Sequence, residues 1–570
     1  MESSNKSLRF GPDELAKARE TLSTEGRIVA RQKLIDQGAL DGILGSAPRT
    51  TDGKRLFKSV DFTGSTFEGD VNFNGTTFAG PSLFAYVTFN GGAYFEEATF
   101  EVETSFVAAL FNCDVSFGKA KFHGDAEFHA ATFKSMAGFP YATFAREAQF
   151  GERMSAPDPR YRTNFEGDAH FDHARFEGHA SFGGTTVGGV AAFTRARFEE
   201  VQHLGPMLVA GELRIDDAQF AQRAWIEFAS KTAWFAGTEF QKGADVRARW
   251  GDVACPQVDF AEPSLITESL PAGDASTPFP PMTPGNDGSS DGTALRPRLV
   301  SLRQARVADL VVSRMDLRSC LFEGAHRLDA MRTERGAFAA APSGRRWTAR
   351  RTLAEEHRWR AETLSAEIER YRSRASEGGG LSAWWAARRM SALKRKRVGW
   401  YPPDCRPPEW HGERQRADPA AIAELYRSLR KGFEDRRNEP GAADFYYGEM
   451  EMRRNAAGGV RQLDTPAKDR GERWVLWLYW LFSGYGLRAS RAFAALAATF
   501  LLFAAVLYAV GLKEPDVADA IVQSLEGATL RSGDGELLTS GGQALQVALR
   551  LLGPAFLGLA LISLRGRVKR

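Results

Sequence analysis

The sequence has little cysteine, no excess of charge of either sign and no short signature of enzyme chemistry. Its four cysteines lie far apart and form no Cys-x-x-Cys pair: Cys113, Cys255, Cys320 and Cys405. With no signal peptide ahead of them, they favour a reduced, cytosolic setting and argue against a disulfide framework or a zinc site. Because 74 Lys and Arg face 71 Asp and Glu, the total charge indicates no class of partner.

Signatures of catalysis and of metal binding are missing as well. The sequence has no GxGxxG, P-loop, nucleophile elbow or HExxH stretch. Metal ligands must converge on one point, whereas the histidines fall at different positions of a repeat: His123, His129, His170, His173 and His179. We therefore expect variable surface histidines, no cofactor and no enzymatic activity.

What the sequence does have is a comb of phenylalanines. One series runs from Phe67 to Phe144 and a second from Phe62 to Phe150, each with a phenylalanine at every eleventh position. A small residue stands two positions before many of them, as Ala120 does before Phe122. Neither a helix, with period 3.6, nor a strand, with period 2, produces this interval. A fixed period of this kind predicts a repeat architecture in which stacked units bury the aromatic rings together.

The comb breaks once and later changes its period. It stops at the insertion Gly151–Asn164 and resumes shifted by one residue, with apolar substitutes such as Val187 in the phenylalanine slots. We interpret this insertion as a loop on one coil. The pattern is ragged after Ile226 and ends near Val246.

A stricter patch follows, with apolar residues spaced by five: Leu302, Val307, Val312, Leu317 and Phe322. It predicts about one further coil, with Cys320 in its core. We interpret the Pro-, Gly- and Ser-rich stretch 261–298 between the two patches as a disordered loop.

This pattern resembles the pentapeptide repeat family, whose unit places a small residue at i−2 and Leu or Phe at i. The resemblance implies a right-handed, four-sided β-helix over residues 57–260 and a further coil at 299–340. Eight or nine coils with a rise of about 4.8 Å would be about 40 Å long. Some soluble members mimic DNA with an acidic rod, and this comb carries about ten more acidic than basic residues. An acidic stripe on one face would favour that function, and scattered acids would not.

Helical regions are expected on both sides of the solenoid. Residues 1–50 include a run of helix formers from Pro12 to Leu44 and predict a helical cap on the open end. Residues 341–473 are helical in pattern and basic.

Within the basic region, Trp384, Trp385 and Trp400 alternate with Arg388, Arg389 and the run Lys394–Arg397. This stretch fits a helix on an anionic membrane surface, a nucleic-acid contact or a solvated helix. A membrane segment nearby favours lipid over nucleic acid.

A helical hairpin is predicted further along. Leu425, Leu429 and Phe433 mark one amphipathic helix, Pro440 and Gly441 a turn, and Ala442–Arg454 the second helix. Its acidic side chains, Asp444, Glu449 and Glu451, are expected to be ordinary surface charges, since no nucleophile or histidine accompanies them. The stretch NEPGAADFYYGEMEMRR resembles one found in membrane-anchored bacterial pentapeptide repeat proteins.

Residues 474–570 predict a membrane hairpin. Phe493–Leu512 is about 20 uncharged residues long, and Gln543–Leu564 is a second span interrupted by Arg550. Interfacial aromatics precede the first span: Trp474, Trp477, Tyr479, Trp480 and Tyr485. Basic residues flank the spans and an acidic connector joins them, which predicts both termini in the cytoplasm of a bacterium.

Two functions follow as hypotheses. The first is a non-enzymatic scaffold at the bacterial inner membrane, with membrane lipid and an unidentified protein as partners and nucleic acid not expected. The second is a channel-like subunit, a homo-oligomer in this case, because two spans with a short connector resemble the two-helix pore module of cation channels. The connector has the sequence GATLRSGDG at Gly527–Gly535, without the potassium filter sequence.

Overall fold

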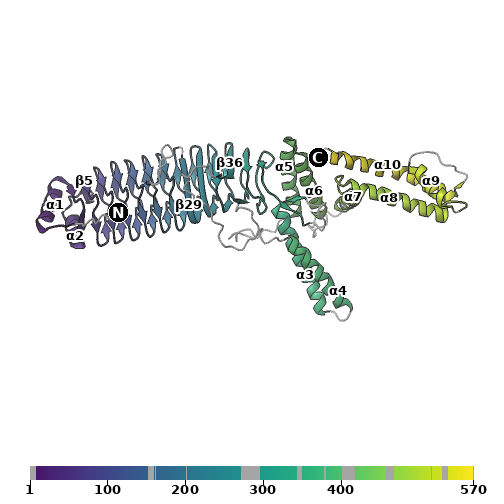
Figure 1. Ribbon diagram of the computed structural model, residues 1–570, viewed down its shortest axis with the longest axis horizontal. Helices are drawn as coiled ribbons and strands as arrows, with labels where there is room; N and C mark the ends of the chain where they lie inside the picture. The colour runs from purple at the N-terminus through teal and green to yellow at the C-terminus, as the bar shows by residue number, and fades with distance from the viewer. Residues whose placement is uncertain are drawn as a thin grey trace. The chain divides into compact units, whose positions relative to one another are not determined.

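The computed structural model describes residues 8–151, 160, 162–200, 202–270, 296–342, 350–377, 381–400, 418–456, 468–514, 516–528 and 537–568. Its contacts divide the chain into two compact units: Met1–Ala340 with Tyr401–Gly412, and Ala341–Trp400 with Glu413–Arg570. The first unit is a β-solenoid with two helices at one end, and the second is helical (Figure 1).

The solenoid consists of parallel strands stacked coil upon coil, and it makes about 11 turns. In one column β6 (Thr66–Phe67) pairs with β10 (Thr88–Phe89), which pairs with β14 (Leu110–Phe111). Every second phenylalanine of one series therefore lies in the same column. A second column forms a ten-stranded sheet: β4 (Leu56–Phe57), β8 (Thr77–Phe78), β12 (Thr99–Phe100), β16 (Lys121–Phe122), β20 (Thr143–Phe144), β24 (Arg175–Phe176), β28 (Arg197–Phe198), β30 (Gln219–Phe220), β32 (Glu239–Phe240) and β35 (Asp259–Phe260). The predicted solenoid is confirmed.

The phenylalanine comb is the core of this solenoid. Phe95 and Phe117 are fully buried, and their rings stack with centroids 4.8 Å apart at an interplanar angle of 7°. Each ring also meets a ring of a neighbouring column edge-on, as Phe106 meets Phe117 at 5.3 Å and 80°. Stacked and edge-on contacts are the favoured arrangements of aromatic rings, so the period of the sequence and the packing of the core agree.

The coils on either side of the insertion stack directly on one another. Phe133 pairs with Phe165 and Phe150 stacks on Phe182, although the insertion lengthens the sequence between the two members of each pair. The neighbouring coils therefore keep their register across the insertion. Its residues 152–159 and 161 lie outside the described residues, and so do residues 271–295 of the predicted disordered loop.

The solenoid extends further than the comb indicates, because the coil shortens. Phe220, Phe240 and Phe260 lie opposite one another, and the step between them is shorter than the earlier step from Phe198 to Phe220. The strands on another side lengthen, as in β29 (Gln202–Arg214) and β31 (Ala224–Trp234). The pattern looked ragged because the extra residue of alternate units is lost here. The solenoid thus makes about 11 turns rather than eight or nine, and the buried Cys320 lies in its last part.

The N-terminal cap mixes helix and strand. Helices α1 (Pro12–Glu25) and α2 (Gln37–Ser46) enclose β2 (Arg27–Val29) and β3 (Lys33–Ile35), which pair with β5 (Ser59–Asp61) and β6. The predicted helical cap is therefore present, but it also contains two strands that the sequence did not indicate. Gly26 adopts a left-handed φ of 71° and ends α1, and the two strands cover the first coil with backbone hydrogen bonds.

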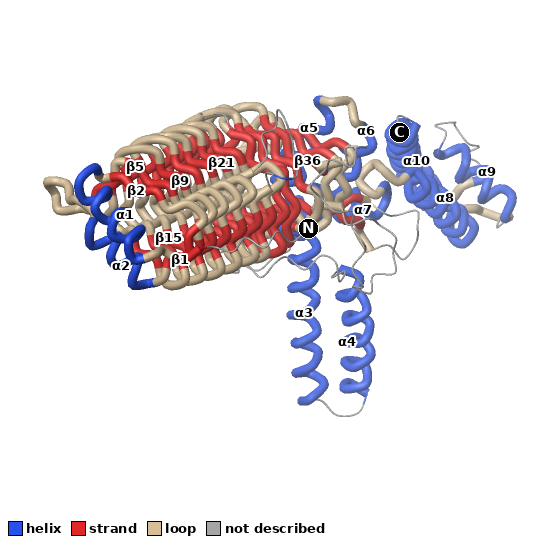
Figure 2. The backbone as a smooth tube through the Cα atoms, turned by 60° about the vertical axis from the view of Figure 1, so that its left-hand side comes forward, coloured by secondary structure: helices blue, strands red, loops and turns tan. Residues whose placement is uncertain are grey.

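The second unit contains two helical hairpins and an apolar part. The helices are α3 (Ala354–Glu377), α4 (Leu381–Trp400), α5 (Pro419–Asp435), α6 (Glu439–Ala456), α7 (Lys468–Ser483), α8 (Ala489–Val506) continued by the π-helical turn η4 (Leu507–Gly511), α9 (Val517–Ala528) and α10 (Ser540–Val568). Helices α3 and α4 lie side by side (Figure 2). Among the described residues, the 23-residue segment Ala489–Gly511 is long and apolar enough to cross a membrane. Helix α10 covers the predicted second span, which stays a prediction.

Candidate functional site

The helices α5 and α6 pack closely enough to bury a tyrosine between them. Tyr426 is fully buried beside Phe445, and the ring of Phe445 stacks on Phe433. A Cβ on Gly448 would lie 2.4 Å from the ring of Tyr426, so this approach of the two helices requires glycine. The predicted hairpin is present, but Pro440 does not lie in the turn that connects the two helices. It lies in the first turn of α6, and the first turn of a helix is a position where proline is favoured.

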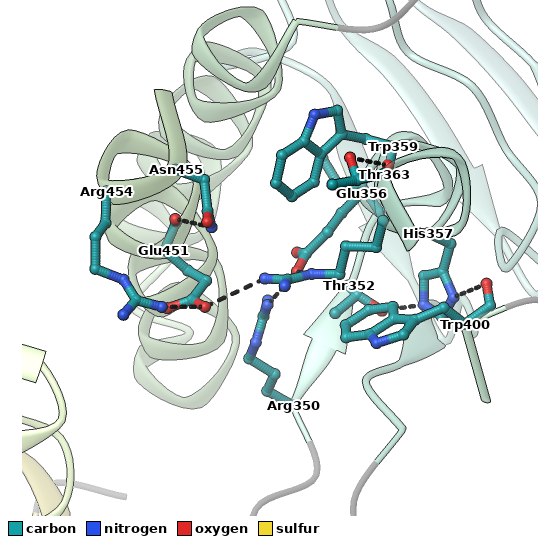
Figure 3. Close-up of polar contacts among 12 residues, drawn as sticks. Arg350, Thr352, Glu356, His357, Trp359, Thr363, Trp400, Glu451, Arg454 and Asn455 are labelled. Carbon is teal, nitrogen blue, oxygen red and sulfur yellow. Dashed lines mark hydrogen bonds and ion pairs between the residues drawn. The ribbon is translucent and has the colours of Figure 1, made fainter. Parts of the chain in front are cut away.

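Glu356 of α3 is the centre of a buried ion-pair network (Figure 3). Its Oε1 accepts hydrogen bonds from Arg350 Nη2 at 2.6 Å and Arg360 Nε at 2.7 Å. Its Oε2 accepts one from the hydroxyl of Tyr426 at 2.6 Å, and that hydroxyl in turn accepts from the backbone N–H of Leu353 at 2.9 Å. The carboxylate thus joins α3 to α5 and to the segment that precedes α3.

Glu451 of α6 is a second centre, joined to the first by Arg360. Its Oε1 accepts from Arg360 Nη2 at 3.2 Å and from Arg454 Nη2 at 2.8 Å, and its Oε2 accepts from the hydroxyl of Tyr485 at 3.2 Å. Tyr485 is itself buried and stands four residues before α8 begins. The network therefore connects α3 and α6 with the turn that leads into the candidate membrane helix.

The expectation that Glu449 and Glu451 are surface charges was wrong. Their exposures are 1% and 9%, and Glu449 is paired with Arg430 of α5 and Arg453 of α6 at 3.2 and 2.8 Å. The burial of Glu451 could not be predicted from the sequence, because its partner Arg360 of α3 lies 91 residues earlier.

Charge pairing outweighs burial at Glu356. Burial raises the pKa of its carboxyl. The guanidinium groups of Arg350 and Arg360 and the Tyr426 hydroxyl lower this pKa by more than burial raises it, so that it falls to about 2. Burial and the neighbouring carboxylate raise the pKa of Tyr426 well above its usual value. The acid is therefore ionised and the phenol neutral at physiological pH.

His357 of α3 contacts the segment before α3 and the end of α4. The Nε2 of His357 lies 2.7 Å from Thr352 Oγ1, and its Nδ1 lies 3.2 Å from the carbonyl oxygen of Trp400 at the end of α4. Burial lowers the pKa of His357 despite the nearby carboxylate of Glu356. The imidazole therefore joins the start of α3 to the end of α4.

The arrangement of this network suits a structural joint. Both oxygens of Glu356 and of Glu451 accept hydrogen bonds from fixed donors, so neither carboxylate is aimed at a substrate. Such pairs specify the arrangement of the helices that carry them, and breaking one partner leaves buried charge uncompensated. The network thus links α3, α5, α6 and the turn at Tyr485.

Acidic residues of the solenoid lie in more than one column. Asp70 and Asp114 share one column, and Asp125 and Glu147 share another. Several of these carboxylates accept backbone hydrogen bonds from the next coil: Asp70 Oδ1 accepts from Gly92 N at 2.8 Å. These four carboxylates are therefore divided between two columns and do not form one acidic stripe.

The histidines of the repeats do not converge on a metal site. The ring of His173 stacks on Tyr141 at 4.4 Å, and His170 Nδ1 lies 3.3 Å from Asp172. Within the described ranges, no group of three His, Cys, Asp or Glu side chains is arranged to hold a metal ion.

The predicted aromatic belt divides into two parts. Trp474 and Trp477 of α7 are exposed. Trp480 instead lies under the guanidinium groups of Arg454 and Arg491, at 4.7 and 4.9 Å from its ring centroid. Tyr485 belongs to the buried network. An exposed belt therefore includes the first two tryptophans but not Tyr485.

Comparison with known proteins identifies the solenoid. Residues 56–95, 73–121, 84–132 and 161–202 match the family model described as pentapeptide repeats, with 9 copies. The chain therefore contains pentapeptide repeats, and the resemblance drawn from the phenylalanine comb is confirmed. Proteins of this kind are generally non-enzymatic and structural. No curated protein and no solved structure matches the chain.

Proposed function

We propose that the chain is a non-enzymatic scaffold, anchored in the inner membrane of a bacterium, whose solenoid offers a rigid surface to a protein partner. The observation that carries the proposal is the segment Ala489–Gly511. Only 6% of the most apolar stretch of this segment is buried within the chain. Leu501 and Leu502 are 70% and 63% exposed. Side chains this apolar are stable when lipid covers them.

Helix α10 supplies the second span of the proposal. It packs against α8, and several of its leucines are exposed as well, among them Leu551 at 73% and Leu561 at 57%. With two spans, the positive-inside rule places both termini and the solenoid in the cytoplasm.

Extraction of membranes with alkaline carbonate tests the anchor. The wild-type chain should stay in the pellet. Leu501→Arg with Leu502→Arg places two charges in one span at a cost of about 3 kcal/mol each, and the same changes at Leu551 and Leu552 disrupt the second span. The quadruple variant should move to the supernatant, and release of the wild-type chain would refute the anchor.

A matched control and a test of sidedness use the first unit. Val29→Arg with Leu270→Arg changes two exposed apolar residues of that unit, 66% and 54% exposed, and should leave the chain in the pellet. The exposed Cys113 should react with a membrane-impermeant maleimide only after the cells are opened. Labelling in intact cells would contradict a cytoplasmic solenoid.

A second candidate, a channel-like subunit, is favoured by α9. This short helix packs against both α8 and α10, and the Nε2 of Gln546 donates to Oε1 of Gln523 at 3.1 Å between buried side chains. A short helix between two spans is the arrangement of a pore helix. Residues 529–536 of the expected filter stretch lie outside the described residues. The mass of the detergent-solubilised particle decides: a tetramer supports this candidate, and a monomer refutes it, because two spans cannot enclose a pore.

A further inference from the structure

The outer face of α4 carries exposed aromatic and basic side chains together. Leu381, Trp384 and Trp385 in its first turns are 79%, 51% and 63% exposed. At 100° per residue, the exposed Arg388 and Arg395 project from the same side of the helix as these three residues. We call the side formed by Leu381, Trp384, Trp385, Arg388, Arg395 and Lys396 the α4 outer face.

The opposite side of α4 packs against α3. Ala386 and Leu393 are 6% and 4% exposed, and Ile368 of α3 is 4% exposed. The two helices lie side by side (Figure 2). Because these buried apolar residues form the packing within the hairpin, the exposed tryptophans of the outer face are not needed to hold it together.

The tryptophans are arranged as a compact amphipathic cluster. The rings of Trp384 and Trp385 meet edge-on with centroids 5.1 Å apart, and the guanidinium of Arg388 lies over Trp384 at 5.4 Å. Tryptophan is enriched at the boundary between headgroups and acyl chains, because its ring is apolar and its N–H is polar. An arginine beside it reaches phosphate groups at the same depth.

The charge of α4 has one sign. Its six basic residues are all exposed, and the helix has no Asp or Glu: Arg388, Arg389, Lys394, Arg395, Lys396 and Arg397. By contrast, exposed basic residues of α3 alternate with acids, as in the pair of Glu369 and Arg372 at 2.8 Å. Basic residues attract both anionic lipid and nucleic acid. The exposed Leu381 beside two tryptophans favours lipid, because a phosphate backbone has no apolar layer to receive it.

The hairpin is held next to the entry of the candidate span. Glu356 and Arg360 in the first two turns of α3 connect through Glu451 to Tyr485, four residues before α8 begins. If α8 enters the bilayer, the base of α3 lies close to its surface. The end of α4 at Trp400 contacts His357 at this base, so Trp384 and Trp385 lie at the other end of α4. They reach the headgroups when the hairpin lies along the membrane surface.

We propose that the α4 outer face binds the anionic headgroups of the membrane in which the chain is anchored, with the hairpin of α3 and α4 along the membrane surface and Trp384 and Trp385 at the headgroup boundary. This inference rests on the proposed anchor. It adds a second, charge-dependent contact that orients the helical unit on the membrane, as a polybasic segment next to a span does.

The test uses the full chain in nanodiscs. Cys113→Ser and Cys405→Ser remove two thiols, while Cys255 and Cys320 are buried, and Ser391→Cys introduces a site for an environment-sensitive fluorophore on the exposed side of α4. One nanodisc contains phosphatidylcholine alone and the other equal parts of phosphatidylcholine and phosphatidylglycerol. We expect blue-shifted emission in the anionic nanodisc only. Raising the ionic strength from about 0.1 to about 1 M should abolish the shift.

Charge reversal supplies the decisive variant. Arg388→Glu, Arg395→Glu and Lys396→Glu together should weaken docking by at least about 100-fold, since each basic residue contributes about fivefold near an anionic surface. The variant should therefore lose the shift. A control with the same change in net charge, Lys17→Glu, Lys54→Glu and Lys121→Glu, alters exposed residues of the first unit and should keep it.

Equal emission in both nanodiscs would overturn the proposal, and so would a shift that the α4 triple variant retains. A shift in neutral nanodiscs on addition of duplex DNA, without one on anionic lipid, would overturn it in favour of nucleic acid. Failure of the anchor is separate, because the chain then fails to incorporate into either nanodisc. Salt-sensitive flotation with phosphatidylglycerol vesicles would in that case still show binding by α4.

Discussion

The buried carboxylate of Glu356 should stabilise the helical unit in a pH-dependent way. A pKa that falls from 4.5 to about 2 corresponds to about 3 kcal/mol in favour of the ionised form in the folded state. Because the folded-state pKa is the lower one, this contribution is present above about pH 4.5 and is lost as the pH falls through about 2. Glu356→Gln removes the charge and leaves Arg350 and Arg360 without their common partner.

We therefore expect Glu356→Gln to lower the free energy of unfolding of the helical unit by about 3 kcal/mol at pH 7. Urea unfolding of the full chain in detergent, followed by the helical far-UV circular dichroism signal, measures it. The difference between variant and wild type should shrink as the pH is lowered towards 2, since the wild-type carboxyl is then protonated too.

The matched control is Glu369→Gln on the same helix. Glu369 pairs with Arg372 at 2.8 Å, but both side chains are more than 60% exposed, and such pairs contribute less than about 1 kcal/mol. Equal losses for the two variants would refute the reasoning, and so would a loss at Glu356 that does not depend on pH.

Three further predictions concern packing and reactivity. Phe117→Ala leaves a cavity in the ring stack and should cost the solenoid about 3–5 kcal/mol in urea unfolding. Gly448→Ala would place a Cβ 2.4 Å from the ring of Tyr426; overpacking costs about 1–3 kcal/mol, and it should appear as faster amide hydrogen exchange in α5 and α6. Cys113 is exposed, whereas Cys255 is buried and burial raises the pKa of its thiol. A maleimide should therefore label Cys113 at once and Cys255 only in urea, and early labelling of Cys255 would contradict its burial.

The solenoid was readable from the sequence because its period is local. Phe95 and Phe117 stack because they are alternate members of one series of the comb, and every coil of the comb repeats this relation. The end of the solenoid was harder to predict, because the spacing of the phenylalanines changes there. The shorter step from Phe220 to Phe240 removes the extra residue on which the eleven-residue period depended.

The buried network was not readable, because its members are joined by tertiary structure alone. In the sequence, Glu451 looks like any charged residue on the surface of a helix. Only the packing of the folded hairpins brings Arg360 beside it. One local signal was available. Gly448 stands in the middle of α6, where glycine is unfavourable, and it marks the close approach of the helix that carries Tyr426.

The equivalence of the coils has a consequence for how this protein can change over evolution. Phe89 has Phe67 on one side and Phe111 on the other, with the same parallel register at both interfaces. Duplicating or deleting the sequence of one whole coil would therefore join surfaces that already fit each other. The solenoid can thus become longer or shorter by whole coils, each about 4.8 Å high. The contacts between neighbouring coils stay the same when this happens.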